Sequence, residues 1–378
     1  MADDASYVNQ PLLTYLGNKR KLIAPIVKAV SEICDTLGKP KLNVLDAFSG
    51  SGVVARALAL HAKELHANDW ELYSYAQAQC FVVKPTEDQK KDIKSHIERM
   101  NALDFDHEGI VCQHYAPKDS KNIEMGERCF FTRENALRID TMRKYISQQP
   151  ATLQPYLLAP LLIKSSVNTN TSGQFQAFHK NRAGLGAWGG EFAKCTSRIT
   201  GDIKLEAPVF SKSDYQGFAH NLEVFQCLQS FADGHLDVIY LDPPYNHRQY
   251  SYLYFLLNVI AENKLPETIT AGAGATDPKL RNNSDFCIKK KVVDLFVRLV
   301  KLCTLKSKYT LLSYSNESLV KPDEMLKILE PYDVRVSVRE HSRYNVRGDE
   351  HTRAASKTTE EFIYVISSKK GTKRKKDE

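Results

Sequence analysis

The chain has 378 residues, 42% of them hydrophobic, which is enough to bury one large core, or one core and a subdomain. Its formal net charge of +7 favours an anionic partner. No apolar run reaches transmembrane length, and the first ten residues lack the charged and apolar segments of a signal peptide. The eight cysteines form no C-x-x-C pair. We therefore expect a reduced, cytoplasmic protein with no membrane association, disulfide framework or metal site.

Strand and helix patterns alternate through the first 167 residues. Apolar residues at helical spacing predict a first helix over 20–37. The segment KLNVLDAFSGSGVVARALALHA, residues 41–62, has the pattern of a strand, a glycine turn and a helix. The other elements expected here are a strand at 64–68 and helices at 71–83, 87–104, 133 to about 146, and 151–167, with Thr86 and Thr132 as N-caps of two of them.

Regular patterns are lost from residue 168 to about 216, where glycines cluster, and they return afterwards. Strands that alternate with helices predict a mainly parallel α/β sheet, and the last two strands predict an antiparallel hairpin at its edge. The elements expected in this half are helices at 221–231, 249–262, 285–305 and 322–330, strands at 236–241, 309–314, 332–341 and 360–367, and a loop at 269–284.

The glycine turn GSGVVA, residues 50–55, fits the G-x-G-x-x-G/A template between a strand and a helix. Asp69 follows the second strand, where an acid can hydrogen-bond a ribose hydroxyl. Nicotinamide, flavin and S-adenosylmethionine enzymes all use such a turn, and a turn without a ligand is the structural alternative. Asp46 opposes a pyrophosphate but suits a cationic ligand, such as a sulfonium that carries an amino group.

A second motif, Asp242-Pro243-Pro244-Tyr245, ends the strand at 236–241. Proline has no N–H, so two prolines stiffen the turn and leave their carbonyls free of competing donors. The Asp242 carboxylate and these carbonyls can accept the two hydrogens of a planar amino group, and the Tyr245 ring offers a flat face. The pattern therefore favours chemistry on an exocyclic amine that needs positioning more than deprotonation. A strand that prolines simply terminate is the alternative.

With both motifs in place, the chain resembles the DNA N6-adenine methyltransferases of the alpha group, the Dam-like adenine methylases. The resemblance is carried by TYLGNKRKLI (14–23), LDAFSGSGVVA (45–55), NDWELYSY (68–75) and LDPPYNHRQY (241–250), in that order. FFTRENALRID, NTNTSGQFQAF and NSDFCIKKKVVDLF are similar to segments of a restriction-modification branch. The resemblance implies a Rossmann-like S-adenosylmethionine-dependent methyltransferase sheet with an inserted target-recognition subdomain.

That resemblance also implies an activity and its partners. The activity is methyl transfer from S-adenosylmethionine to N6 of a flipped adenine in a specific sequence of double-stranded DNA. The enzyme would be the modification enzyme of a restriction-modification system, with a cognate restriction endonuclease as a possible partner, or an orphan methylase. We expect it in the cytoplasm, at the nucleoid, as a monomer, with a dimer as the alternative.

Matched position by position, the resemblance implies roles for individual residues. Asp242 would hold the adenine amine near the methionine part of the cofactor, Pro243 would complete the set of acceptors, and Tyr245 would stack on the base; Pro244 belongs to the same catalytic motif. His220-Asn221 departs from the family, many members of which carry an acid there. The cofactor-binding residues implied are Tyr15, Lys19, Asp46, Phe48, Gly50, Gly52, Asp69 and Asp242.

The spacing of the motifs predicts an insertion. Asp46 and Asp242 are 196 positions apart (242 − 46), whereas three βαβ crossovers need only about 90 residues. The expected catalytic domain is residues 11–110 and 217–367, the target-recognition region is 111–216, and 368–378 is a basic disordered tail. Six Lys or Arg against two acids lie between 164 and 204. The DNA-binding candidates are Lys180, Arg182, Arg198 and, in the loop SRYNVRGDEHTR, Arg347.

Two other classes share parts of this pattern. RNA and protein-glutamine methyltransferases have the glycine turn and a similar proline-proline-tyrosine element, but they usually begin it with Asn and lack a YLGNKRK block. A non-catalytic DNA-binding protein is the second alternative, although every residue that the chemistry needs is present. A solvated glycine-rich connector is the alternative for the insertion.

Overall fold

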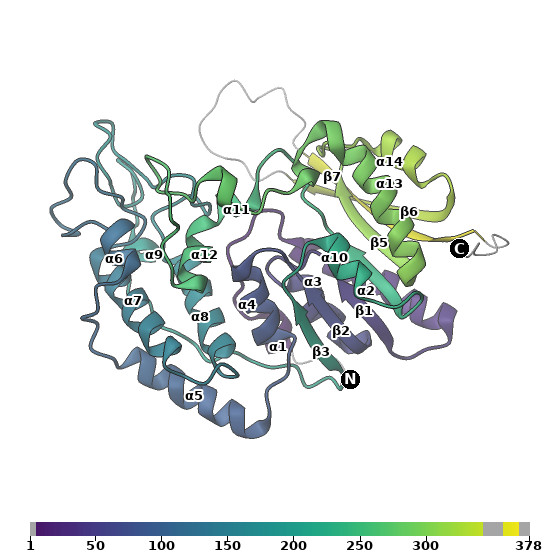
Figure 1. Cartoon of the computed structure of the whole chain (residues 1–378), viewed down its shortest axis with the longest axis horizontal. Helices are drawn as coiled ribbons and strands as arrows, with labels where there is room; N and C mark the ends of the chain where they lie inside the picture. Colours follow the sequence, from purple (N-terminus) through teal and green to yellow (C-terminus); the bar gives the residue numbers. More distant parts are fainter. Residues whose placement is uncertain (1–4, 343–357, 370–378) are drawn as a thin grey trace.

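The computed structural model describes residues 5–342 and 358–369 and contains a seven-stranded mixed sheet (Figure 1). The strand order is β3-β2-β1-β4-β5-β7-β6. The first five strands in this order are parallel, and β7 is antiparallel to both of its neighbours. The strands are β1 (Leu42–Asp46), β2 (Ala62–Asn68), β3 (Gln216–His220), β4 (Leu236–Leu241), β5 (Ser307–Ser315), β6 (Tyr332–Ser342) and β7 (Thr358–Ser368).

The parallel α/β sheet and its terminal hairpin confirm the fold expected from the alternating patterns. β6 and β7 pair along their whole length at one edge of the sheet. The order reverses between β1 and β4, because the chain first winds outward through β2 and then returns to the other side of β1. In open α/β sheets a reversal of this kind leaves a crevice at the carboxyl ends of the strands.

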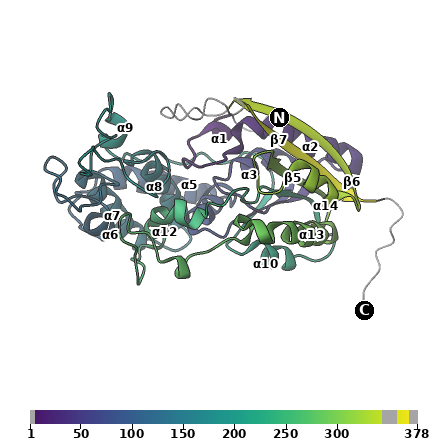
Figure 2. The same cartoon turned by 90° about the horizontal axis from the view of Figure 1, so that it is seen from above.

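Neighbouring residues of the central strands enter different cores, which explains their continuous apolar sequences. Val44 and Val238 belong to one cluster of buried side chains, and Leu45 and Ile239 belong to a second. Successive side chains of a strand point to opposite faces, so the two clusters lie on opposite faces of the sheet. Figure 2 shows two of the covering helices, α2 (Ile23–Leu37) and α13 (Lys289–Lys306), on opposite sides.

The other helices add to these two cores. The first cluster includes residues of α3 (Val53–Leu58), α4 (Leu72–Phe81), α5 (Glu87–Asn101), α7 (Arg133–Ser147), α8 (Gln154–Val167) and α12 (Phe255–Glu262). The second includes α10 (Val224–Gln229) and α14 (Pro322–Leu329). The short helices are α1 (Ala5–Asn9), α6 (Ile110–His114), α9 (Ser197–Thr200) and α11 (Tyr250–Leu253), with 3₁₀ turns at Lys19–Leu22, Ala59–His61, Pro278–Leu280 and Asp285–Cys287. Among the described residues no helix is both long and apolar enough to cross a membrane.

Two helix starts confirm the capping residues expected from the sequence. The Thr86 side chain accepts a hydrogen bond from the backbone N–H of Gln89, whose side chain accepts from the N–H of Thr86 in return. Thr132 likewise accepts from the N–H of Asn135. Such caps satisfy N–H groups that have no partner within the helix.

Two of the differences between the expected elements and the structure lie close to the cavity or at the edge of the sheet. β3 falls in a segment without strand periodicity; Gln216 is exposed and the other four residues are half-buried, so no apolar alternation marks this edge strand. The helix expected over 249–262 is divided into α11 and α12 at Tyr254, where the backbone leaves helical geometry. The Tyr254 hydroxyl accepts a hydrogen bond from the N–H of Leu16, so a tertiary contact holds the break.

The inserted helices are packed onto the rest of the protein. Gln77 of α4 donates to the carbonyl of Ala159 in α8, and the buried Arg143 of α7 donates to the carbonyls of Ile260 and Ala261 at the end of α12. In Figure 1 α7 and α8 belong to a lobe beside the sheet, and α4 lies between this lobe and the sheet. The division of 11–367 into a catalytic and a recognition module therefore stays a prediction, since α7 and α8 share a core with the sheet.

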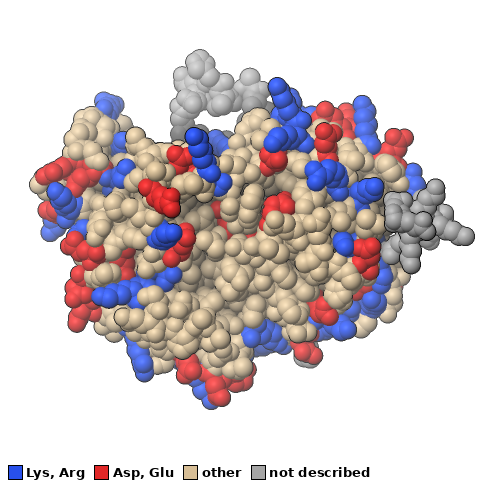
Figure 3. Space-filling model, in the orientation of Figure 1, with Lys and Arg blue, Asp and Glu red and all other residues tan. Residues whose placement is uncertain are grey.

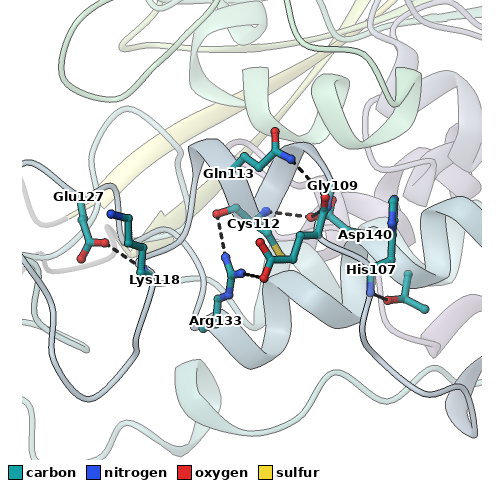
Figure 4. A network of polar contacts seen from close by, with 10 residues as sticks. His107, Gly109, Cys112, Gln113, Lys118, Glu127, Arg133 and Asp140 are labelled. Atoms are coloured by element: carbon teal, nitrogen blue, oxygen red, sulfur yellow. Dashed lines mark hydrogen bonds and ion pairs between the residues drawn. The ribbon is translucent and has the colours of Figure 1, made fainter.

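A buried carboxylate organises the start of the insertion. Asp140 accepts hydrogen bonds from the backbone N–H groups of Gly109, Val111 and Cys112, which fixes α6 on α7 (Figure 4). Arg133 donates to the Cys112 carbonyl in the same network. These contacts use N–H groups at the helix start that otherwise have no partner, so the network is structural.

Candidate active site

A cavity of about 340 Å³ lies at the carboxyl ends of β1, β2 and β4, within the size range of small-molecule sites. The loop after β1, the start of α4, the segment after β4 and residues 15–19 all contribute to its wall. Of the predicted site residues, the wall includes Tyr15, Lys19, Asp46, Phe48, Gly50, Asp69, Asp242, Pro244 and Tyr245. Residues that are up to 230 positions apart (245 − 15) therefore meet in one place.

Asp46 ends β1 beneath the glycine turn and is buried. Its Oδ2 accepts a hydrogen bond of 3.0 Å from the N–H of Ala55, whereas its Oδ1 is buried and has no hydrogen-bond partner. Burial and the neighbouring Asp242 carboxylate raise the pKa of Asp46 to about 8. A buried carboxylate oxygen without a partner is destabilising, so a cationic donor in the cavity would stabilise it.

Asp69 follows β2 and holds the glycine turn in place. Its two carboxylate oxygens accept hydrogen bonds from the backbone N–H groups of Gly50, at 2.7 Å, and of Glu71, at 2.9 Å. Burial raises the pKa of Asp69 to about 6, although these hydrogen bonds oppose the shift. Gly50 has φ +51°, and a Cβ there would lie 2.8 Å from the Tyr15 ring, so only glycine fits.

Asp242 directly follows the strand β4 and pairs with a residue from the far N-terminal part of the chain. Its Oδ1 lies 2.9 Å from the Lys19 Nζ, and Lys19 is 4% exposed. Burial raises the pKa of Asp242 to about 6, although the Lys19 ammonium opposes this shift. Burial alone would lower the pKa of Lys19, but Asp242, followed by Glu361 of β7, outweighs it and raises that pKa. Lys19 therefore carries a charge and favours the ionised form of Asp242.

Tyr245 and the segment around Gly17 are in close contact. The Lys19 ammonium lies 5.1 Å from the centre of the Tyr245 ring, a distance typical of a cation–π contact. Gly17 has φ +76°, and a Cβ there would lie 2.6 Å from the Tyr245 hydroxyl. The glycine of the YLGNK segment therefore allows the backbone to approach the ring.

A cluster of tyrosines fixes the N-terminal part of the wall. The Tyr15 ring stacks on Tyr254 with 5.0 Å between centroids, and Tyr250 lies 5.2 Å away. The Tyr250 hydroxyl donates to the Leu16 carbonyl, whereas Tyr254 accepts from the Leu16 N–H. Tyr250 and Tyr254 are four positions apart, a spacing that is typical of two residues on the buried face of a helix. Their role in holding residues 15 and 16 was not predictable from the sequence.

Part of the cavity wall is formed by residues that no motif in the sequence indicated. Leu222 to Phe225, Glu71, Phe286 and Arg298 also line the cavity. Glu223 stands three positions after the His220 at which the family pattern places an acid, and its side chain accepts from the N–H of Phe225. Asn221 instead donates to the carbonyl of Asp69, outside the cavity wall. Glu223 is therefore the acid of this segment that lies at the cavity wall.

Glu71 is a further buried acid at the wall. It is 6% exposed, and Asn258 donates to its carboxylate. Burial raises the pKa of Glu71 to about 8. Glu71 also lines a neighbouring cavity of about 320 Å³ between α4, α12 and the loop at 264–282. Acids outnumber cations around the main cavity, so it suits a cationic ligand better than a pyrophosphate.

Some predicted residues lie away from the cavity wall. Gly52 is the N-cap of α3 and Pro243 is buried, and neither lines the cavity. Lys180 lies over the Phe178 ring, Arg182 is paired with Glu191 at 3.5 Å, and Arg198 donates to backbone carbonyls of residues 167 and 171. Arg347 and the tail from 370 are outside the described residues, and β7 continues to Ser368.

Basic and acidic side chains are interspersed on the lobe of inserted helices and around the rim of the sheet (Figure 3). The middle of the same face is mostly uncharged. The distribution on this face does not by itself single out a DNA-binding surface.

Comparison with known proteins identifies a family for this chain. Residues 15–328 match the family model described as D12 class N6 adenine-specific DNA methyltransferase. The chain is 28% identical to the type II methyltransferase M.CviAII of Paramecium bursaria Chlorella virus 1, over 93% of this chain and 97% of that protein.

Two further relatives have the same kind of name. The chain is 27% identical to the type II methyltransferase M.NlaIII of Neisseria lactamica, over 94% of this chain and 99% of that protein. It is also 27% identical to the type II methyltransferase M.FokI of Planomicrobium okeanokoites, over 93% of this chain and 52% of that protein. With the family model spanning both motifs and the cavity between them, the chain belongs to the D12 class of N6 adenine-specific DNA methyltransferases.

Proposed function

We propose that this methyltransferase transfers a methyl group from S-adenosylmethionine to N6 of an adenine turned out of double-stranded DNA. The observation that carries the proposal is the meeting of Asp46 and Asp242 at one cavity at the reversal of strand order. Asp46 lies in the part of the cavity where a cofactor would fit, and Asp242 begins the turn that suits an amine.

The residues present fit S-adenosylmethionine, which supplies an activated methyl group on a sulfonium. The unpartnered Asp46 Oδ1 would accept from the cofactor's amino group. Asp69 would accept from a ribose hydroxyl with the lone pairs that its two backbone hydrogen bonds leave free. Phe48, Phe225 and Phe286 lie close together, with centroids of 48 and 286 at 5.7 Å, and offer an aromatic slot for the adenine ring.

In the amine site, we assign Asp242 and the carbonyl of Pro243 to the two hydrogens of N6. These acceptors would draw the nitrogen toward tetrahedral geometry and so localise its lone pair. Lys19, at 2.9 Å from Asp242, keeps this acid ionised and therefore an acceptor. The proton that N6 loses after transfer has Asp242 as its first acceptor, since burial raises the pKa of Asp242 to about 6.

Reaching N6 requires the adenine to leave the duplex stack, at a cost of a few kcal/mol. Tyr245 is half-buried at the wall, with Lys19 over its ring. We assign the ring to stacking on the extruded base, which offsets part of that cost. Exposed basic residues of the insertion, chiefly Lys180 and Arg182, are the candidates for phosphate contacts.

The relatives are named as type II methyltransferases and modification methylases, which supports a place in a restriction-modification system. We propose that this chain protects a specific DNA sequence against a cognate endonuclease. An orphan methylase has the same chemistry and differs only in lacking that partner.

The experiment is to express the protein in a host without adenine methylation and to map modified bases by methylation-aware sequencing. The expected result is N6-methyladenine at one short sequence, absent with Asp242→Ala. Purified protein with radiolabelled S-adenosylmethionine should label duplex DNA and leave RNA and a glutamine-containing protein substrate unlabelled. Label in RNA or protein with none in DNA would overturn the proposal.

A further inference from the structure

A cluster of two histidines and a glutamate lies on β2 and just before β4, away from the cavity. Glu64 and His66 are two positions apart on β2 and therefore point to the same face. His235 comes immediately before β4. The Glu64 Oε2 lies 3.0 Å from the His235 Nε2 and 3.5 Å from the His66 Nε2. The three ligand atoms all lie within 4.8 Å of one another.

His66 is the unusual member of this cluster. It is 6% exposed, and its Nε2 is buried without a hydrogen bond of acceptable geometry. Its other ring nitrogen, Nδ1, lies 3.0 Å from the Nε2 of His220 on the neighbouring strand β3. With the proton on Nδ1, His66 would donate to His220 and its Nε2 lone pair would face the Glu64 carboxylate. A cation between the two would stabilise that arrangement.

We propose that Glu64, His66 and His235 bind a divalent transition-metal ion, with zinc as the best match. A carboxylate oxygen and imidazole nitrogens are zinc ligands at about 2.0–2.1 Å, and tetrahedral geometry then separates them by about 3.3 Å. The separations of 3.0 and 3.5 Å bracket that value. Glu64 and His235 have side chains 22% and 39% exposed, which provides an entry path and space for water as a fourth ligand.

The surroundings of the site support this assignment. His220 would be the outer partner that metal-bound histidines commonly have, accepting from the Nδ1–H of His66 and leaving its Nε2 for the ion. The cysteine spacing gave no reason to expect a metal. The E-x-H pattern on a strand was the overlooked signal.

The position of the ion would make it structural. Glu64 pairs with Asn43 near the amino end of β1, whereas the cavity lies at the carboxyl ends. Five residues of extended chain, roughly 16 Å, separate Glu64 from Asp69. A bound ion would connect β2 to the turn before β4 across β1, so it would stabilise the folded protein. This inference is independent of the proposed methyl transfer.

The test uses the full-length protein without a histidine tag, after chelator treatment and removal of the chelator. Zinc is titrated against a competing chromophoric chelator, and thermal unfolding is followed with and without zinc. We expect one zinc ion per chain and a rise in melting temperature. Co²⁺ should give the intense visible absorption of a tetrahedral site. His235→Ala, at an exposed position, should weaken zinc binding by roughly tenfold or more and abolish the thermal shift.

Two control variants make the result specific. His114→Ala removes a histidine of α6 outside the cluster, and Cys195→Ser removes the exposed cysteine of the chain. Both should bind zinc like the wild type. His220→Asn should weaken binding by about 10- to 100-fold, as loss of an outer partner does. Wild-type protein that binds no zinc, or His235→Ala that binds it unchanged, would overturn the proposal. Unaltered S-adenosylmethionine binding by His235→Ala would establish that this variant is folded.

Discussion

The cavity at the carboxyl ends of the strands and the irregular segment at 168–215 use their polar groups differently. In the cavity, Asp46 has a buried oxygen without a partner. In the irregular segment, the fully buried Asn170 donates to the carbonyls of Cys129 and Ala187 and accepts from the N–H of Gly189. One region leaves a polar atom for a ligand, whereas the other uses its polar atoms to hold a chain with little secondary structure.

This difference changes how the basic residues of the insertion should be read. Arg198 resembled a DNA ligand in the sequence, but its guanidinium donates to the carbonyls of Val167 and Thr171 and so fixes the end of α8. Arg182 is 80% exposed, but it is paired with Glu191. A count of charges therefore overstates the DNA-facing surface.

The largest expected effect is the loss of methyl transfer in Asp242→Ala. Removal of preorganised hydrogen bonds to a reacting group typically lowers the rate by about 10²–10³. Single-turnover transfer of labelled methyl to a duplex measures this effect. DNA affinity should remain within a few-fold of wild type. Asp242→Asn retains one acceptor but adds donors, so its transfer rate should lie between those of Asp242→Ala and the wild type. A rate for Asp242→Ala close to wild type would remove Asp242 from the amine site.

The next largest effect is expected at Tyr245. Base stacking on an aromatic ring contributes about 1–3 kcal/mol, so Tyr245→Ala should reduce transfer by roughly tenfold or more and Tyr245→Phe much less. The alanine variant should recover partly when the target adenine is mispaired, because that base is easier to extrude. Rates on matched and mismatched duplexes decide this. If phenylalanine is as harmful as alanine, the hydroxyl carries the role.

A third prediction concerns Asp46 and pH. Its folded-state pKa of about 8 is above the ordinary value of 3.8, so the folded protein retains a proton that the unfolded chain releases. This contribution to stability is complete below pH 4 and is lost as pH rises through about 8. Asp46→Asn should therefore have a higher melting temperature than the wild type at pH 9 without cofactor, by a few degrees.

The same variant should bind S-adenosylmethionine more weakly. A hydrogen bond to a charged group contributes about 1.5–3 kcal/mol, so the dissociation constant should rise roughly tenfold or more. Wild-type affinity should increase from pH 6 to 7.5, because the cofactor's ammonium requires the ionised carboxylate. Calorimetry measures both. Equal affinities of variant and wild type would show that Asp46 does not contact the cofactor.

The smallest effect is expected from the insertion. Lys180→Ala with Arg182→Ala should lower DNA affinity and reduce its salt slope by about one unit for each lost phosphate contact. Arg198→Ala should instead lower the melting temperature and leave the salt slope unchanged, because its donors are used by backbone carbonyls. Fluorescence anisotropy across salt concentrations separates the two outcomes. An unchanged slope in the double variant would place the DNA elsewhere.

Local signals in the sequence were sufficient for most of the elements. β4 is fully buried, and the prediction of 236–241 for this strand is confirmed. Thr86 and Thr132 begin their helices as expected. β3 was not found, because a half-exposed edge strand has no apolar alternation. The break at Tyr254 was also missed; the hydroxyl of this residue accepts a hydrogen bond from Leu16, 238 positions away, and no local pattern indicates such a contact.

The motif residues, and the carboxyl ends of the strands as the place where they meet, could be predicted from local patterns, because strands that alternate with helices put all carboxyl ends together. Which polar atoms are free depends on contacts between distant segments. Lys19 pairs with Asp242, Arg198 is used by a helix end, and Glu64, His66 and His235 converge from two segments. Such pairings depend on distances between residues far apart in the chain, which no local pattern encodes.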